Sequence, residues 1–325
     1  MKVLITGGAG FIGSFLAQEY ENNGHSVTIL DNLSTGNLKN LNSFGFKGER
    51  ISGDIRDTAL VSGLVEKTDL IFHMAAALGV SNIMNSPIES ISTNILGSEV
   101  VLKAADKYKK RIFIASTSEI YGKNPKQPLS EEDDRVIGTP QNIRWSYSDA
   151  KAIEEAMARS LNIQNGLKVT TVRFFNTVGP RQTGRYGMVI PKLVQSALKN
   201  EDLLVHGDGS QSRVFCHVAD AISAVTQLMN TEKSIGEVYN VGGVGEVTIK
   251  ELAEKVIIRC KSSSRIQLIP YKEVYPVGFE DMQRRVPNIS KIRDLLGWNP
   301  LRDLGQIIDD VIEHHRLILQ SEAEY

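Results

Sequence analysis

Runs of mostly apolar residues alternate with helical patterns through the first half of the chain. Such runs are typical of central parallel strands, which are buried on both faces. Helical patterns cover residues 11–23, where Gly24 indicates the end, as well as 97–108 and 147–163. The alternation predicts an α/β fold, a Rossmann-type doubly wound parallel sheet covered by helices. The predicted strands are residues 3–5, 27–30, 70–73, 112–115 and 169–172.

The pattern changes about halfway along the chain. Loops rich in glycine and proline follow at 178–181 and 206–209. A helical pattern at 218–229 and an apolar run at 238–241 then predict that the second half returns to the first sheet. The end of the chain, residues 292–319, predicts two helices separated by a Trp-Asn-Pro turn.

A G-x-G-x-x-G pattern at residues 8–13, extended by Gly7, lies directly between a predicted strand and a predicted helix. This context favours dinucleotide binding, because glycines let the backbone approach a pyrophosphate and the helix N-terminus offers free N–H groups. Asp31 ends the second strand, 18 residues beyond Gly13, and can accept both ribose hydroxyls. Since Asp31 would repel a 2′-phosphate and Asn32 is neutral, the pattern predicts NAD rather than NADP.

Tyr147 and Lys151 are four residues apart in a predicted helix, so their side chains share one face. An ammonium beside a phenol stabilises the phenolate, so we expect Lys151 to lower the pKa of Tyr147 and let it remove a hydroxyl proton. The polar residues 116–119 follow the predicted strand 112–115, at the sheet edge where ligands bind. The spacing therefore predicts a catalytic site at this edge.

Composition narrows the class of protein. The 325 residues are 41% hydrophobic and 23% charged, which excludes a disordered or collagen-like chain. The formal net charge of −1 leaves no basic excess for a nucleic acid or an anionic membrane. Cys216 and Cys260 are far apart and no histidine has metal-ligand spacing, so we expect free thiols and no metal site. We also expect a cytoplasmic protein, because no targeting or membrane-spanning segment is evident.

Together these residues resemble the extended short-chain dehydrogenases/reductases that act on nucleotide sugars, over almost the whole chain. The motifs that carry the resemblance lie at 6–13, 31–36, 53–57, 73–76, 94–97, 147–151 and 175–181.

The resemblance implies a division into an NAD-binding domain, residues 1–176 rejoined by about 215–243, and a smaller, interleaved α/β domain, residues 177–214 and 244–325, that binds the nucleotide sugar. The predicted catalytic residues are Tyr147, Lys151, Thr117, Ser118 and Glu119. The predicted cofactor-binding residues are Gly7, Gly10, Phe11, Ile12, Gly13, Asp31, Asn32, Ser34, Thr35, Gly36, Asp54, Ile55, Ala75, Ala76, Asn94, Tyr147 and Lys151. The predicted substrate-binding residues are Thr117, Asn176, Val189, Arg185, Arg213 and Arg285, with Asn176, Arg213 and Arg285 on the diphosphate.

Such enzymes oxidise the sugar at C4, and the step that follows decides the reaction. Glu119 is typical of UDP-glucuronate decarboxylases and of 4,6-dehydratases, and the Arg-x-Pro-Asn stretch ending at Asn288 also resembles the decarboxylases. Against this, Met188 replaces an arginine that decarboxylases place near the substrate carboxylate, with Arg185 as a possible substitute, and residues 186–192 resemble UDP-sugar 4-epimerases.

Decarboxylation of UDP-glucuronate, to UDP-xylose or its 4-keto pentose, is therefore the leading prediction. Epimerisation of a UDP-sugar at C4 is the alternative, and 4,6-dehydration is third. A redox-sensing, NAD-binding regulatory protein is the non-enzymatic alternative. The resemblance also implies a homodimer in which the helices near 97–108 and 148–163 form an intersubunit four-helix bundle.

Overall fold

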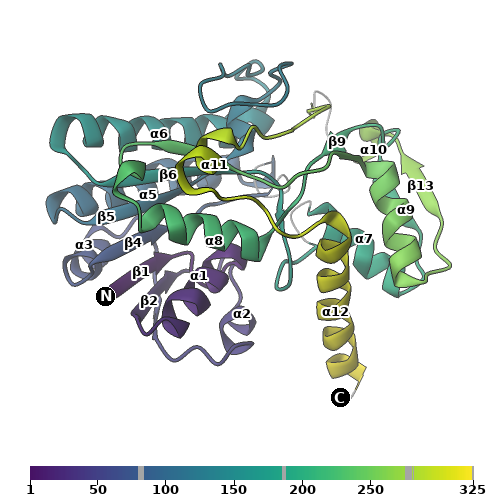
Figure 1. Ribbon diagram of the computed structural model, residues 1–325, viewed down its shortest axis with the longest axis horizontal. Coiled ribbons are helices and arrows are strands. Elements are labelled where there is room, and N and C mark those ends of the chain that lie inside the picture. Colours follow the sequence, from purple (N-terminus) through teal and green to yellow (C-terminus); the bar gives the residue numbers. More distant parts are fainter. Residues whose placement is uncertain (80–83, 185–187, 275–279, 281, 324–325) are drawn as a thin grey trace.

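The structure is a computed structural model of the whole chain. It describes residues 1–79, 84–184, 188–274, 280 and 282–323. Two bodies of unequal size lie side by side in Figure 1, a larger one built on a central sheet that begins at the N-terminus and a smaller one that contains the C-terminal helix.

The larger body contains a seven-stranded sheet with the order β11-β6-β5-β4-β1-β2-β3, and all its neighbouring strands are parallel. The chain enters at the centre, extends to one edge and then returns beside β1 to build the other half. The reversal sets Thr6 of β1 beside His73 of β4. The strands are β1 (Lys2–Thr6), β2 (Ser26–Asp31), β3 (Glu49–Ser52), β4 (Leu70–His73), β5 (Arg111–Thr117), β6 (Val169–Phe174) and β11 (Val238–Val241).

Helices cover both faces of this sheet, which confirms the predicted doubly wound fold. α1 (Phe11–Asn22) and α8 (Val218–Met229) pack on one face. α3 (Thr58–Glu66), α5 (Pro87–Lys107) and α6 (Ser146–Asn165) cover the other.

Local sequence signals explain several ends of these helices. The Asp57 carboxylate accepts hydrogen bonds from two backbone N–H groups at the start of α3, and Pro87 opens α5 at a position where no N–H is needed. Gly166 ends α6 in the left-handed conformation, with a φ of 70°. A short helix, α2 (Leu38–Asn42), is capped by Asn37.

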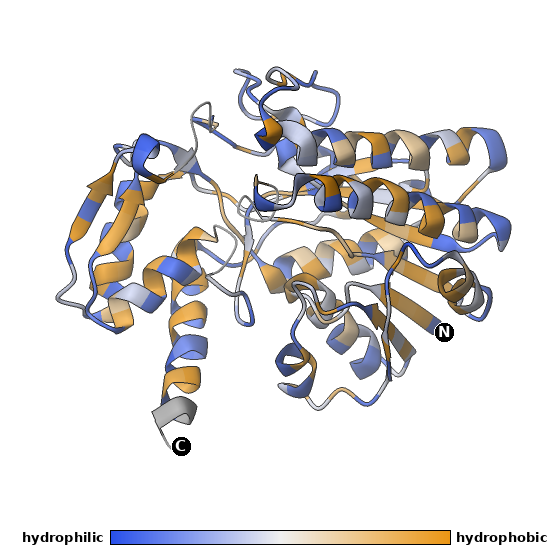
Figure 2. Cartoon of the chain, turned by 180° about the vertical axis from the view of Figure 1, so that it is seen from behind, coloured by the Kyte–Doolittle hydropathy of each residue, from blue (hydrophilic) through white to orange (hydrophobic). Residues whose placement is uncertain are grey.

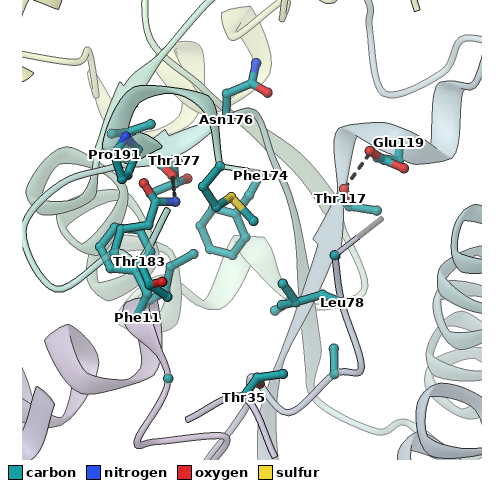
Figure 3. Close-up of a pocket in the computed structure, with 18 of the residues that line it drawn as sticks. Phe11, Thr35, Leu78, Thr117, Glu119, Phe174, Asn176, Thr177, Thr183 and Pro191 are labelled. Carbon is teal, nitrogen blue, oxygen red and sulfur yellow. Dashed lines mark hydrogen bonds between the residues drawn. The ribbon is translucent and has the colours of Figure 1, made fainter. Parts of the chain in front are cut away.

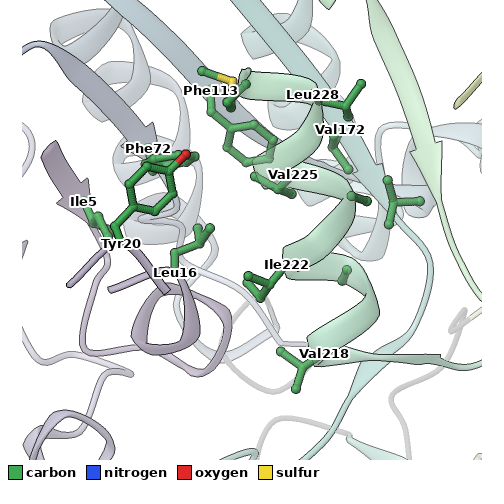
Figure 4. Close-up of a cluster of buried hydrophobic side chains, with 14 of the residues drawn as sticks. Ile5, Leu16, Tyr20, Phe72, Phe113, Val172, Val218, Ile222, Val225 and Leu228 are labelled. Carbon is green, nitrogen blue, oxygen red and sulfur yellow. The ribbon is translucent and has the colours of Figure 1, made fainter. Parts of the chain in front are cut away.

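The core beneath α1 and α8 is built around a row of aromatic rings. Tyr20 of α1 lies 4.9 Å from the Phe72 ring, Phe72 lies 5.7 Å from Phe113, and Phe113 lies 6.2 Å from Phe174. These rings cross three adjacent strands, and the apolar face of α8 packs over them (Figure 4). Figure 2 shows the same apolar strands enclosed between helices whose outer faces are more polar.

The smaller body has its own apolar core. β8 (Leu203–His206) pairs in parallel with β13 (Ile266–Ile269), and α7 (Val189–Leu198), α9 (Ile249–Cys260) and α12 (Leu304–Ala323) pack with them. The remaining short elements are η1 (Ser118–Tyr121), η2 (Ile143–Trp145), β7 (Thr177–Val178), β9 (Ser212–Arg213), β10 (Cys216–His217), η4 (Glu232–Ser234), β12 (Val247–Thr248), α10 (Tyr271–Val274) and α11 (Ser290–Leu296).

Several elements differ from the sequence prediction. α5 begins ten residues before the predicted start at 97, because its buried face there consists of small polar residues such as Ser90 and Asn94, which hydrophobic periodicity does not detect. The edge strand β3 carries exposed polar side chains and was missed for the same reason.

The predicted division into domains stays a prediction, and the second predicted domain includes residues of the larger body's core. Ile289, Ile292 and Trp298 fall within the second predicted domain, yet they pack in the core of the larger body, where α11 contacts β11. Among the described residues, no helix is both long enough and apolar enough to cross a membrane.

The aromatic row makes Phe113 a sensitive point for stability. Phe113→Ala should lower the free energy of unfolding by about 3–5 kcal/mol, because it opens a cavity between the rings of Phe72 and Phe174. Urea denaturation followed by circular dichroism measures this. Ile258→Ala, at a side chain that is 74% exposed on α9, should change stability by less than about 0.5 kcal/mol. Equal losses in the two variants would contradict this view of the core.

His73 lies fully buried at the carboxyl end of β4, with the Thr6 hydroxyl 2.8 Å from Nδ1 and the Ser98 hydroxyl 2.9 Å from Nε2. Burial, with a smaller contribution from the Lys151 ammonium, lowers the pKa of His73 from 6.5 to about 3. The folded chain therefore keeps this imidazole neutral under conditions in which the unfolded chain protonates it.

This difference predicts that stability falls as the pH drops from 6.5 towards 3, because only the unfolded chain takes up the His73 proton in that window. Between these pH values, the free energy of unfolding of His73→Gln should change with pH by about 1.4 kcal/mol per unit less than that of the unchanged protein. Urea titrations at pH 7, 6 and 5 on both proteins measure the slopes. Parallel slopes would show that His73 is protonated in the folded protein.

Candidate active site

A cavity of about 580 Å³ runs along the carboxyl ends of the central strands, between the sheet and the smaller body. This is the edge where open parallel sheets bind ligands. In Figure 3, Thr117 and Glu119 lie at the end of β5, well away from Phe11 and Thr35. The cavity is therefore elongated, with the glycine turn on one side and the catalytic strand on the other.

Most of the predicted site residues line this cavity. They are Gly7, Gly10, Phe11, Ile12, Gly13, Asp31, Asn32, Ser34, Thr35, Ile55, Ala75, Ala76, Thr117, Ser118, Glu119, Tyr147, Lys151, Asn176, Val189, Arg213 and Arg285. The predicted substrate ligand Arg185 lies outside the described residues.

Three predicted cofactor residues support the wall instead of lining it. The Asp54 carboxylate pairs with Arg56 at 2.7 Å, which lowers the pKa of Asp54. Asn94 bonds both the N–H and the carbonyl of Ala77, at 2.8 and 3.0 Å, and so fixes the loop after β4. Gly36 packs so closely on Asp31 that a Cβ would lie 2.8 Å from its Oδ1.

The turn after β1 leaves no room for side chains. Gly7 has a φ of +69°, and a Cβ there would lie 2.7 Å from the backbone of Ala75. A Cβ on Gly13 would lie 2.3 Å from the carbonyl oxygen of Gly7. α1 follows directly, after Gly10, which has no side chain to cap it. The first N–H groups of α1 therefore remain available for a phosphate, and the cradle fits a dinucleotide.

Asp31 stands where the second strand meets this turn. Its Oδ2 accepts a hydrogen bond from the Ala9 N–H at 2.9 Å and its Oδ1 accepts one from the Leu33 N–H at 2.8 Å. Burial raises the pKa of Asp31, and these two bonds partly oppose that effect. Each carboxylate oxygen can accept a further hydrogen bond, so the arrangement suits the two hydroxyls of a ribose.

Tyr147 and Lys151 project from the start of α6 into the cavity, as the spacing predicts. The electrostatics differ from the expectation, however. Burial raises the pKa of Tyr147, and the carboxylates of Glu119 and Glu154 raise it further. Lys151 does not act as the expected unopposed positive charge, because its ammonium lies 2.7 Å from Glu154 Oε2 and 2.8 Å from the Ala115 carbonyl.

The acid after β5 is held by two arginines. Arg144 donates to both carboxylate oxygens of Glu119, from Nη1 to Oε2 at 2.5 Å and from Nη2 to Oε1 at 2.9 Å. Arg285 Nη2 lies 3.5 Å from Glu119 Oε1. Burial alone would raise the pKa of Glu119, but Arg144, Arg285 and more distant Arg213 overcome this and hold it at about 2. Glu119 is therefore a carboxylate at neutral pH, not a proton donor. The Thr117 hydroxyl caps the same turn by accepting the Glu119 N–H.

Sequence reasoning missed Arg144. It lies in η2, three residues before Tyr147, so one turn of helix carries both side chains towards the cavity. The predicted helix began only at residue 147, and an arginine three residues before Tyr147, a spacing that places two side chains on one helix face, was the signal that could have found it. Arg285, which was predicted to bind the diphosphate, places its Nη1 3.3 Å from the Ser118 hydroxyl at the start of η1.

The opposite wall carries other cationic and amide groups. The Arg213 guanidinium donates to the Ser212 carbonyl at 2.8 Å, and the Asn176 amide donates to the Val214 carbonyl at 2.8 Å. Arg181, which was also not predicted, lies 4.2 Å from the centre of the Phe15 ring, and burial lowers its pKa to about 10. In the part of the chain that the structure describes, no group of three His, Cys, Asp or Glu residues could hold a metal ion.

Comparison with known proteins agrees with this geometry. Residues 4–311 match the family model of GDP-mannose 4,6 dehydratase. The chain is 42% identical to a UDP-N-acetyl-alpha-D-glucosaminuronate decarboxylase of Bacillus cytotoxicus over 98% of both chains. It is 35% identical to UDP-glucuronic acid decarboxylase 1 of Danio rerio, over 99% of this chain and 74% of that protein.

A solved structure is also similar. The UDP-glucuronic acid 4-epimerase of Bacillus cereus, in complex with UDP-glucuronic acid and NAD, superposes with a TM-score of 0.87 at 25% identity, over 98% of this chain and all of that one. The family resemblance and the fold class are thus confirmed: this chain belongs to the GDP-mannose 4,6-dehydratase family of extended short-chain dehydrogenases/reductases.

Proposed function

We propose that this protein is an NAD-dependent decarboxylase of a UDP-linked hexuronic acid, either UDP-N-acetylglucosaminuronate or UDP-glucuronate. Two decarboxylases of such sugars are 42% and 35% identical to it over nearly its whole length. The observation in the structure that carries the proposal is the ionised Glu119, held between Arg144 and Arg285 beside Tyr147.

The cofactor would lie along the glycine turn. Its pyrophosphate would meet the N-terminus of α1, and the Asp31 carboxylate would accept the ribose hydroxyls. NAD held there would supply the hydride acceptor for oxidation at C4 and the hydride donor for the final reduction. The aromatic and aliphatic side chains of Phe11, Ile12 and Ile55 would exclude water along this part of the cavity.

Tyr147 would act as the base that accepts the proton of the C4 hydroxyl. As hydride leaves C4, the phenolate accepts the proton of the C4 hydroxyl, and Thr117 can hydrogen-bond the same oxygen from β5. Burial and two carboxylates disfavour the phenolate in the chain alone. A positively charged cofactor ring beside Tyr147 would oppose these effects and favour the phenolate.

The C4 ketone makes the C5 carboxylate a β-keto acid. The C5–C6 bond breaks, CO₂ leaves, and the bonding electrons pass to the C4 oxygen as an enolate. A proton from solvent then adds at C5, so the overall reaction consumes one proton and releases one CO₂. Arg285 is the guanidinium that we assign to the substrate carboxylate, because it contacts Ser118 and holds Glu119 less closely than Arg144 does.

This assignment also addresses Met188, which stands where the resemblance places an arginine. Met188 lines the cavity, so that wall offers a thioether to the sugar. Arg144 and Arg285 approach the reacting end from other segments of the chain and provide the positive charge that a carboxylate requires.

The ionised Glu119 argues against dehydration. Loss of a C6 hydroxyl requires a group that can protonate the leaving oxygen, and such a group must hold a proton near neutral pH. The pKa of Glu119 is about 2, and its neighbour Ser118 is a far weaker acid than a carboxylic acid.

Epimerisation at C4 remains the second candidate, because the Bacillus cereus relative is a UDP-glucuronic acid 4-epimerase and uses a related fold. It would share the Tyr147 chemistry but return the hydride to the other face of the ketone before CO₂ is lost. A regulatory protein has less support, since Tyr147, Lys151 and Thr117 line one cavity.

Incubation with NAD and each of the two UDP-uronates tests the proposal. At least one should release CO₂ and give a product lighter by that mass, and Tyr147→Phe should reduce turnover by about a hundredfold or more, because no group then accepts the C4 hydroxyl proton. Mass spectrometry and trapped CO₂ are the measurements. Recovery of an isomeric uronate without CO₂ would assign a 4-epimerase instead, and full activity in Tyr147→Phe would contradict the mechanism.

We further propose that the protein forms a homodimer through α5 and α6. These helices pack side by side on the sheet, and their outer surfaces carry exposed apolar side chains. Ile88 and Leu96 lie eight residues apart on α5, 78% and 50% exposed, and Ile153 on α6 is 43% exposed. Pairing with the same helices of a second copy would bury them in a four-helix bundle.

The double variant Leu96→Glu/Ile153→Glu should convert the dimer to a monomer, because charges would replace the apolar contacts. Light scattering should give twice 35.9 kDa for the unchanged protein and 35.9 kDa for the variant. Ile258→Glu, on α9, is the matched control and should remain a dimer. A monomeric unchanged protein would refute the proposal.

A further inference from the structure

The ammonium of Lys151 is held in place by the protein. Its side chain is 2% exposed, and Nζ donates to the Ala115 carbonyl at 2.8 Å and to Glu154 Oε2 at 2.7 Å. An ammonium has three N–H donors, so two are used by these contacts. The third is left for the cavity, which Lys151 lines beside Tyr147.

Glu154 is an unusual residue for the interior of a helix face. It is fully buried one turn after Lys151, and burial raises the pKa of its carboxyl group, while the Lys151 ammonium and the Ser98 hydroxyl oppose this effect. Its second oxygen, Oε1, accepts no standard hydrogen bond from the described residues, but it faces His73 Nε2 at 3.8 Å. A buried carboxylate in such a place is costly unless its charge serves a partner.

A chain of buried polar groups lies behind Glu154. Since His73 is neutral, one ring nitrogen donates and the other accepts. Thr6 lies at Nδ1 and Ser98 at Nε2, 2.8 and 2.9 Å away. The Thr6 hydroxyl oxygen also accepts a hydrogen bond from the Ala75 N–H at 3.4 Å, which ties this group to the loop after β4. Ser98, which contacts Nε2 of this imidazole, also interacts with Glu154, and its hydroxyl lowers the pKa of that carboxyl group.

We propose that Glu154 is a positioning residue for Lys151, and that His73 and Ser98 hold its carboxylate in turn. The arrangement links the glycine turn and the wall of the cavity, through Thr6 and Ala75, to the ammonium beside Tyr147. Its effect is to aim the third N–H of Lys151 at the cofactor side of the cavity.

The neighbouring Glu155 has different partners from Glu154, so the two carboxylates have different roles. The Glu155 carboxylate faces the other way, where Arg173 binds it at 2.8 Å and Ser116 donates to it. It does not contribute to the pKa of Tyr147, whereas Glu154 raises that pKa together with Glu119, and Arg144 lowers it. Glu155 is therefore a matched control, a buried carboxylate of the same helix that lies outside the Lys151 contacts.

Glu154→Gln removes the charge and keeps the shape. We expect the Kd for NADH to rise about tenfold, because the ammonium loses its charged partner and its orientation. We expect kcat to fall at least about tenfold with KM for the UDP-sugar within about twofold. In a plot of kcat against pH, the acid limb should move to lower pH by about one unit, because loss of the negative charge at residue 154 lowers the pKa of Tyr147.

Glu155→Gln should lower the melting temperature but leave the NADH affinity and the acid limb unchanged. Glu154→Asp keeps the negative charge on a shorter side chain. It should therefore weaken NADH binding without moving the acid limb of the kcat–pH profile. If Glu154→Gln does not fold, Ser98→Ala should weaken NADH binding about two- to threefold. NADH fluorescence measures affinity without any sugar, so this arm holds even if the proposed substrate is wrong. An unchanged NADH affinity in Glu154→Gln, or an equal loss in Glu155→Gln, would overturn the proposal.

Discussion

The structure depends on neutralising charges that are buried at the carboxyl end of β5. Glu154 is fully buried there, and the side chains of Glu119 and Glu155 are only 17% and 10% exposed, so each requires a cationic partner because an unpaired carboxylate away from water is strongly unfavourable. The partners come from different places. Arg144 and Lys151 frame the start of α6, Arg173 comes from β6, and Arg285 comes from a segment far along the chain. Charge pairing therefore joins the sheet, its covering helix and the C-terminal region around one cavity.

The sequence predicted the sheet well, because each central strand is an apolar run and the glycine turn follows the first of them. It also predicted that Gly7, Gly13 and Asp31 lie together on one wall of the cavity, where their structural roles are ones that few other residue types could fill. The sequence-based prediction of a helix failed where the buried face of that helix is polar. The first half of α5 buries Ser90 and Asn94, and no hydrophobic periodicity marks such a face.

Charge pairs between distant segments were also beyond the sequence. Nothing in the pattern indicates that Arg285 meets Glu119, or that Glu154 binds Lys151 while Glu155 turns to Arg173. The expected pKa of Tyr147 was wrong for this reason. That expectation rested on the Lys151 ammonium alone, whereas in the folded chain the Glu154 carboxylate lies 2.7 Å from this ammonium. Pairwise spacing on a helix predicts which side chains are neighbours, but it does not predict the total charge around them.

The position of Arg285 has a consequence for how the protein is made. Synthesis proceeds from the N-terminus, and early segments fold first. Strands β1 to β6 and helix α6 have all been synthesised by residue 174, so six of the seven strands and the Tyr147–Lys151 pair are present while more than a hundred residues are still missing. Glu119 then has only Arg144 nearby, and the second guanidinium arrives when the chain is almost complete. The order of synthesis therefore supplies the glycine turn long before the second guanidinium beside Glu119, and the end of the cavity at β5 is completed only after the segment that contains Arg285 has been made.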